Sequence, residues 1–124
     1  MIEKLTVLMV ACDTYLAGAF ARRFERDGWN VVTVTSVKDA EHIAVRLRPS
    51  ALLLHTACTR DVAAEVKRLR ALPTLRRTKV VLLDDGAHMH GVSTALTAGA
   101  ADVLFIGHVV PSDMVTRVRQ LVGV

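Results

Sequence analysis

The chain has 124 residues, 52% of them hydrophobic and 4% aromatic, which is enough for one domain with an aliphatic core. Its net charge of +4 is modest and its basic residues are not interleaved with aromatic ones, so direct nucleic-acid binding is not expected. No apolar stretch reaches membrane-spanning length and no signal peptide is recognisable, so we expect a cytoplasmic protein without membrane association and with reduced cysteines.

Five short apolar runs recur along the chain, each nearly continuous and rich in Val and Leu. They are Leu5–Val10, Val31–Thr35, Ala51–Leu54, Lys79–Leu83 and Asp102–Ile106. Continuous apolar runs of this length are typical of strands that are buried on both faces of a parallel sheet. The sequence therefore predicts five strands.

The segments between and after these strands have the spacing of amphipathic helices. Apolar residues recur every three or four positions at Leu16, Phe20 and Phe24, at Ala40, Ile43 and Leu47, at Val62, Val66 and Leu69, and at Met114, Val118, Leu121 and Val122.

Residues at the segment boundaries agree with this helix assignment. Gly28 and Gly99 each follow a helix, where a left-handed cap suits glycine. Ser36 with Asp39 resembles a capping box, and Pro111 opens the last helix. The fourth helix has no comparable signal at its start, after Gly86 and around His88 and His90.

A β–α unit repeated five times, with short connections and right-handed crossovers, predicts one three-layer α/β domain over residues 1–124. Functional groups of such sheets gather at the carboxyl ends of the strands. These ends are Ala11–Asp13, His55–Cys58, Asp84–Gly86 and Gly107–Val110.

Short motifs along the whole chain, in order and in register, resemble the receiver domain of bacterial two-component response regulators. They are Val7–Val10 with Asp13 and Gly28–Val32, then Arg48–Pro49 (similar to "K-P-D"), Arg70–Pro73 (similar to "R-x-L-P") and Ala98–Asp102 (similar to "A-G-A-D-D"). The resemblance implies a (βα)5 flavodoxin-like, doubly wound parallel sheet with strand order 2-1-3-4-5, as in chemotaxis response regulators.

The resemblance also implies where phosphorylation chemistry would lie, and there the residues differ from the family pattern. The acidic metal ligands fall on Ala11 and Cys12, the phosphoacceptor on His55, the Thr or Ser on Asp84 and the lysine on Ile106; Asp13 alone is acidic beside the first strand. Because an aspartyl phosphate needs a carboxylate nucleophile, a metal and charge neutralisation, we infer a degenerate, or pseudo-, receiver.

The side chains at these strand ends have several interpretations. His55 is a new phosphoacceptor, a metal ligand or, as we expect, a hydrogen-bonded strand-end residue. Cys12 and Cys58 are a redox pair or, as we expect, two small thiols. A zinc site would draw on Cys12 and His55 at adjacent strand ends, and on Asp13, Cys58, Asp84 and His88 from nearby loops. No metal-binding spacing supports that site, so we expect no metal or other cofactor. Asp84–Gly86 is expected to be a turn with a capping role.

The leading hypothesis is a non-enzymatic signalling module that binds itself, an attached effector domain or a partner protein. The resemblance places a dimerisation face on Asp102, Val103, Phe105 and Arg117, although Phe105 equally fits core packing under the last helix. The alternatives are a receiver still switched through His55 or Asp13, and a small-molecule or metal sensor on the same fold. Val124 falls where receivers join an output domain, so a regulator fragment and a stand-alone protein both stay open.

Overall fold

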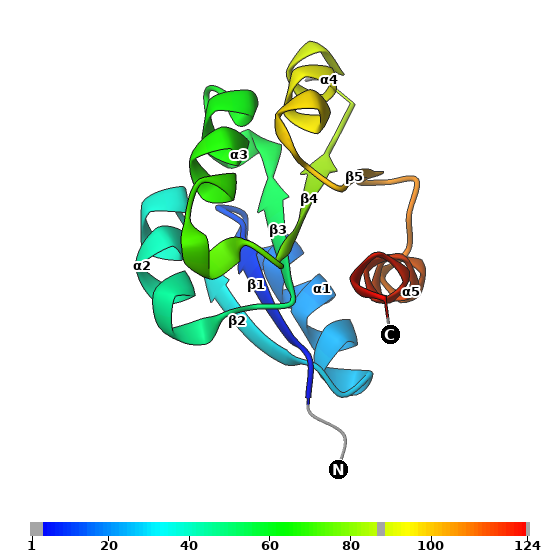
Figure 1. The fold of residues 1–124 in the computed structure, drawn as a ribbon. Helices are drawn as coiled ribbons and strands as arrows, with labels where there is room; N and C mark the ends of the chain where they lie inside the picture. Colours follow the sequence, from blue (N-terminus) through cyan, green and yellow to red (C-terminus); the bar gives the residue numbers. More distant parts are fainter. Residues whose placement is uncertain (1–3, 87–88, 124) are drawn as a thin grey trace.

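The computed structural model describes residues 4–86 and 89–123, which form a five-stranded parallel sheet and its helices (Figure 1). The elements in chain order are β1 (Thr6–Val10), α1 (Thr14–Arg26), β2 (Asn30–Val34), α2 (Val37–Leu47), β3 (Ala51–His55), the 3-10 turn η1 (Thr56–Cys58), α3 (Val62–Arg70), the 3-10 turn η2 (Pro73–Leu75), β4 (Lys79–Asp84), α4 (Met89–Ala98), β5 (Asp102–Phe105) and α5 (Pro111–Val122). The strand order is β2-β1-β3-β4-β5, which confirms the predicted fold.

Alternate residues of the strands build two cores, one on each face of the sheet. Leu8, Leu52 and Leu82 face the core that is covered by α2, α3 and α4. Met9 and Leu53 belong to the other core, which is covered by α1 and α5. Figure 1 shows this arrangement, with α1 and α5 on the opposite side of the sheet from α2, α3 and α4.

Short polar side chains begin three of the helices. Asp13, Ser36 and Asp61 accept hydrogen bonds from the backbone N–H groups of Leu16, Asp39 and Ala64 at 3.0 to 3.1 Å. Each bond satisfies one of the amides that a helix leaves without an internal partner. The predicted Ser36 cap is therefore confirmed, and the Asp13 carboxylate belongs to the start of α1.

Trp29 lies at the amino edge of the sheet, just before β2. Its side chain is 2% exposed and packs edge-on against Phe24, with ring centroids 5.3 Å apart. The guanidinium of Arg119 from α5 lies over the indole, 5.9 Å from its centroid. These contacts join α1, β2 and α5 at the end of the sheet remote from the candidate site.

Two expectations about β5 need correction. The strand ends at Phe105, so Ile106 forms only an isolated bridge with Val109. Val103 packs on the α2–α4 core and Leu104 on the α1–α5 core, so strand alternation places Phe105 with Val103. Phe105 is half-buried on that face and does not lie under α5.

His88 lies outside the described residues. No helix in the described part of the chain is long and apolar enough to cross a membrane.

Candidate functional site

The predicted site residues gather at the carboxyl edge of the sheet, where β1, β3 and β4 lie side by side. His55 is the last residue of β3 and pairs in register with Leu83 of β4. Asp84 is the next residue of β4, so strand alternation directs it to the face opposite His55. The structure thus divides the predicted pocket into two groups of side chains.

Two of the predicted positions are apolar and belong to the core. Ala11 is 2% exposed, and both Ala11 and the half-buried Ile106 pack in the α1–α5 core. The backbone N–H of Ile106 donates to the carbonyl oxygen of Asp84 at 2.8 Å. Neither residue offers a charge or a ligand atom from its side chain.

Asp84 is fully buried and bound on both carboxylate oxygens. Oδ1 accepts a hydrogen bond from the Thr56 hydroxyl at 2.5 Å, and Oδ2 accepts one from the backbone N–H of Gly86 at 2.8 Å. Gly86 has φ +94°, a left-handed conformation that favours glycine. The Gly86 bond forms a turn, as expected at this point of the chain, while the expected capping role falls on a helix start outside the described residues. The Thr56 bond ties β4 to the end of β3.

Cys12 and Cys58 form a disulfide, so the expectation of two separate reduced thiols is wrong. Their Cα atoms are 5.6 Å apart, and the backbone N–H of Cys12 also donates to Cys58 Sγ at 2.7 Å. The physical reason is η1: after His55 the chain turns back within three residues instead of running away from the sheet. Cys58 therefore lies beside Cys12 although it is three residues beyond the strand end.

His55 completes a cluster with these two cysteines. One potential ligand atom from each of Cys12, His55 and Cys58 lies within 4.8 Å of the others. The His55 side chain is 8% exposed, Cys12 is exposed and Cys58 is half-buried. Of the other expected ligands, neither Asp13 nor Asp84 belongs to this group.

The expected interaction face contains one ion pair and one exposed edge. Arg117 Nε of α5 lies 2.6 Å from Asp102 Oδ2 of β5, and Asp102 Oδ1 accepts a hydrogen bond from the backbone N–H of Val103. Phe105 is absent from the residues that build the two cores. Strand alternation directs Asp102, which pairs with Arg117, to the α5 side of the sheet, and Val103 and Phe105 to the α2–α4 side. The four residues thus share the edge strand β5 and its neighbour α5 but are divided between the two sides of the sheet.

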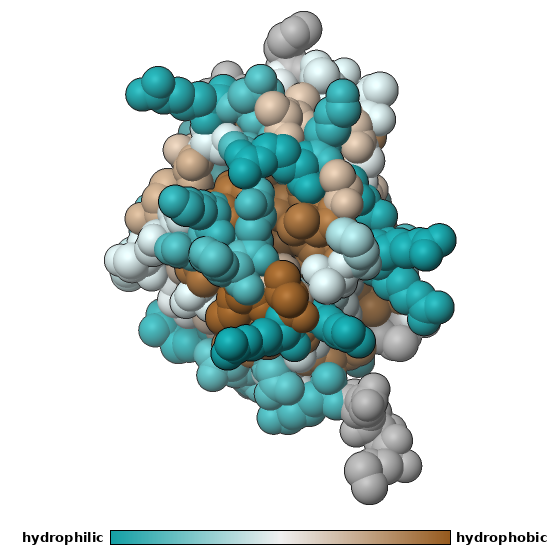
Figure 2. Space-filling view, turned by 60° about the vertical axis from the view of Figure 1, so that its left-hand side comes forward, coloured by the Kyte–Doolittle hydropathy of each residue, from teal (hydrophilic) through white to brown (hydrophobic). Residues whose placement is uncertain are grey.

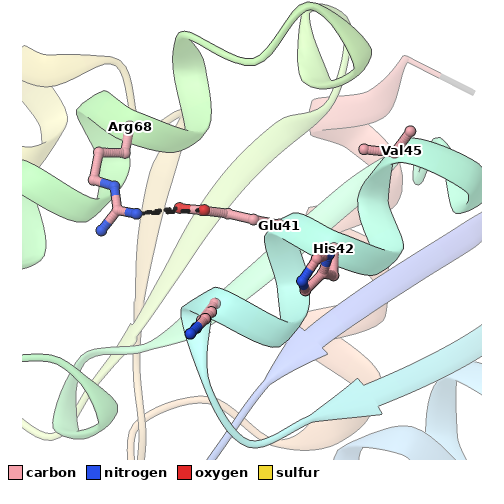
Figure 3. Close-up of a pocket in the computed structure, with 5 residues that line it drawn as sticks. Glu41, His42, Val45 and Arg68 are labelled. Carbon is pink, nitrogen blue, oxygen red and sulfur yellow. Dashed lines mark hydrogen bonds and ion pairs between the residues drawn. The ribbon is translucent and has the colours of Figure 1, made fainter.

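A shallow hollow of about 500 Å³ lies between α2 and α3, and neither cysteine lines it. Figure 3 shows Arg68 of α3 reaching Glu41 of α2, with nitrogen and oxygen 3.2 Å apart. Lys38, His42 and the exposed Val45 complete its lining on α2. Figure 2 shows mainly hydrophilic side chains on this side of the molecule, with apolar surface visible between them. The hollow contains a surface ion pair and no cluster of reactive groups.

No protein-family profile and no curated protein sequence matches the chain. Solved structures do. A signal receiver domain from Bermanella marisrubri is 23% identical with a TM-score of 0.87, covering 98% of this chain and 100% of that one. A response regulator from Thermotoga maritima is 19% identical with a TM-score of 0.85 and the same coverage.

A third structure, the receiver domain of a sensor histidine kinase from Pseudomonas aeruginosa with magnesium in its active-site cleft, is 20% identical. Its TM-score is 0.84, with 98% of this chain and 100% of that chain covered. The chain has the receiver fold.

Sequence reasoning missed Thr56 and misjudged Cys58. Thr56 belongs to no motif. Its role becomes visible only when β3 and β4 are paired, because the residue after β3 then lies within hydrogen-bond distance of the buried Asp84 carboxylate at the end of β4. Cys58 could have been placed beside Cys12 only by predicting the turn after β3 that brings its sulfur back to the strand end. The Thr56-Ala57-Cys58 segment has no glycine or proline to announce that turn.

Proposed function

We propose that this chain is an atypical receiver-type signalling domain of the cytoplasm that works by protein binding and not by aspartyl phosphorylation. Support comes from the fold together with one observation: the groups at the carboxyl edge of the sheet are committed to other contacts. Asp13 caps α1, Asp84 is bound to Thr56 and Gly86, and Ile106 packs in the core.

Phosphoryl transfer to a carboxylate needs an accessible nucleophile, a divalent cation held by oxygen ligands and a positive charge beside the transferred group. His55 stands at the end of β3, and the cation-binding positions after β1 hold Ala11 and Cys12. The position after β5 holds the apolar Ile106. These side chains supply none of the three requirements, which favours a binding role.

The surface that we assign to binding is the edge formed by β5 and α5. Phe105 leaves apolar surface at this edge, and the Asp102–Arg117 pair adds one charge of each sign on the other side of β5. An edge strand that offers a half-buried aromatic group and an ion pair suits a protein partner, an attached effector domain or a second copy of this chain. Light scattering over a concentration series separates self-association from binding to another protein.

The decisive experiment is incubation of the purified chain with a small phosphodonor and Mg²⁺, followed by intact mass measurement. We expect no phosphoryl adduct under conditions that phosphorylate a conventional receiver run in parallel. An adduct that is lost in His55→Ala or Asp13→Asn would instead support a receiver switched by altered chemistry, and would overturn the proposed mechanism.

A further inference from the structure

The Cys12–His55–Cys58 cluster is the one group of its kind in the part of the chain that the structure describes. Its donors are two sulfurs and one imidazole, and no carboxylate of the described residues belongs to the group. Thiolate and imidazole are the ligands of zinc and similar borderline or soft cations, whereas magnesium prefers oxygen. The donor set therefore indicates a transition-metal cation.

We propose that reduction of the Cys12–Cys58 disulfide opens a binding site for one Zn²⁺ ion, held by Cys12 Sγ, Cys58 Sγ and the His55 imidazole. A dithiol reductant supplies two electrons and two protons to the disulfide and becomes a disulfide itself. Zn²⁺ then displaces the two thiol protons as it binds. While the disulfide is intact the two sulfurs are bonded to each other, so the oxidised form does not bind the ion.

The geometry of the cluster suits this exchange. Zinc–sulfur bonds of about 2.3 Å and zinc–nitrogen bonds of about 2.0 Å place tetrahedral donors roughly 3.5 to 3.8 Å apart. The three donors lie within 4.8 Å of one another, so small movements of the two cysteines bring them to this spacing. Cys12 lies in the β1–α1 connection and Cys58 at the end of η1, so neither movement breaks the strand ladder.

One further contact and one surface hollow favour the reduced site. The backbone N–H of Cys12, which donates to Cys58 Sγ at 2.7 Å, stabilises negative charge on that sulfur when it is a thiolate. Cys58 also lines a surface hollow of about 360 Å³ between the starts of α2 and α3. The hollow gives a reductant and a hydrated cation access to the site. Three protein ligands leave a fourth zinc position for water.

The test uses the full chain, reduced by a phosphine and titrated with Co²⁺ alone as a spectroscopic probe for Zn²⁺. We expect one equivalent to bind, with thiolate-to-metal charge-transfer absorption and the visible bands of tetrahedral cobalt, and Zn²⁺ to abolish both. The disulfide form should give neither signal. Oxidation of the zinc form should release one zinc for each disulfide formed.

Variants separate this site from other metal binding. Cys12→Ser, Cys58→Ser and His55→Ala should each weaken Zn²⁺ binding by more than about tenfold, the loss that follows even from changes around a metal's ligands. His42→Ala, on the exposed surface of α2, should leave binding unchanged. Absence of one-to-one binding in the reduced protein, or equal binding by Cys58→Ser, would overturn the proposal. Neither result depends on phosphorylation or on a protein partner, so the proposed function is tested separately.

Discussion

The buried carboxylate of Asp84 shows how one residue at this edge depends on its neighbours. An ionised carboxylate taken out of water is costly unless its oxygens are hydrogen-bonded. Asp84 is 0% exposed and receives bonds from the Thr56 hydroxyl and the Gly86 amide. Thr56, itself 1% exposed, therefore supports the junction of β3 and β4.

Thr56→Val keeps the shape of the side chain and removes the hydroxyl. One oxygen of the buried Asp84 carboxylate then loses a donor, so we expect the free energy of unfolding to fall by about 1–3 kcal/mol. Urea unfolding followed by circular dichroism measures the change.

The matched control is Thr116→Val on α5, where an exposed hydroxyl donates to the Ser112 carbonyl within the same helix. That change should stay within about 0.5 kcal/mol of the parent. Equal changes in the free energy of unfolding for the two substitutions would show that the buried Thr56–Asp84 bond adds no more stability than the exposed bond within α5.

At the scale of elements, one side chain makes three hydrogen bonds to the connection from α3 to β4. Arg70, in the last turn of α3, donates to the carbonyl oxygens of Leu75, Arg76 and Thr78 at 3.1, 3.0 and 2.6 Å. Its aliphatic stem also fills the space beside Gly99, where a Cβ on that residue would stand only 3.0 Å from Arg70 Cγ. One guanidinium thus joins α3 and η2 to the start of β4.

Arg70→Met keeps the stem and removes the three charge-assisted donors. Because hydrogen bonds from charged groups contribute more than neutral ones, we expect a loss of about 1.5–3 kcal/mol in urea unfolding. Arg68→Met in the same helix removes only the ion pairs with Glu41 and Glu65, and should cost less than about 1 kcal/mol. The reverse ranking would contradict the role given to Arg70.

At the scale of the whole molecule, the apolar runs, helical spacing and boundary residues were sufficient to predict the five strands, the helices, the cap at Ser36 and the start of α5 at Pro111. Those features depend on local sequence. The Thr56–Asp84 bond and the Cys12–Cys58 disulfide depend on how loops from different strands return to one edge, which periodicity does not encode. The opposite facing of His55 and Asp84 follows from register, which becomes known only when β3 and β4 are paired.

The disulfide also joins residues 46 positions apart, so it encloses α1, β2, α2 and β3 in one covalent loop. Closing a loop of this length lowers the conformational entropy of the unfolded chain, which in the chain-entropy description raises the free energy of unfolding by about 4 kcal/mol. We expect the oxidised chain to unfold at higher urea than the reduced chain, compared in the presence of a chelator. The double variant Cys12→Ser with Cys58→Ser should be insensitive to reductant; coincident curves for the oxidised and reduced parent would contradict the prediction.

Trp29, buried between Phe24 and Arg119, is the only tryptophan of the chain. Its fluorescence is therefore a single-site reporter placed by the fold at the amino edge of the sheet, across β1 from Cys12. Loss of the contact between α1 and α5 will shift its emission, whereas breaking a bond at the opposite edge will leave it unchanged. Trp29 emission therefore distinguishes unfolding of the whole domain from reduction of the disulfide alone.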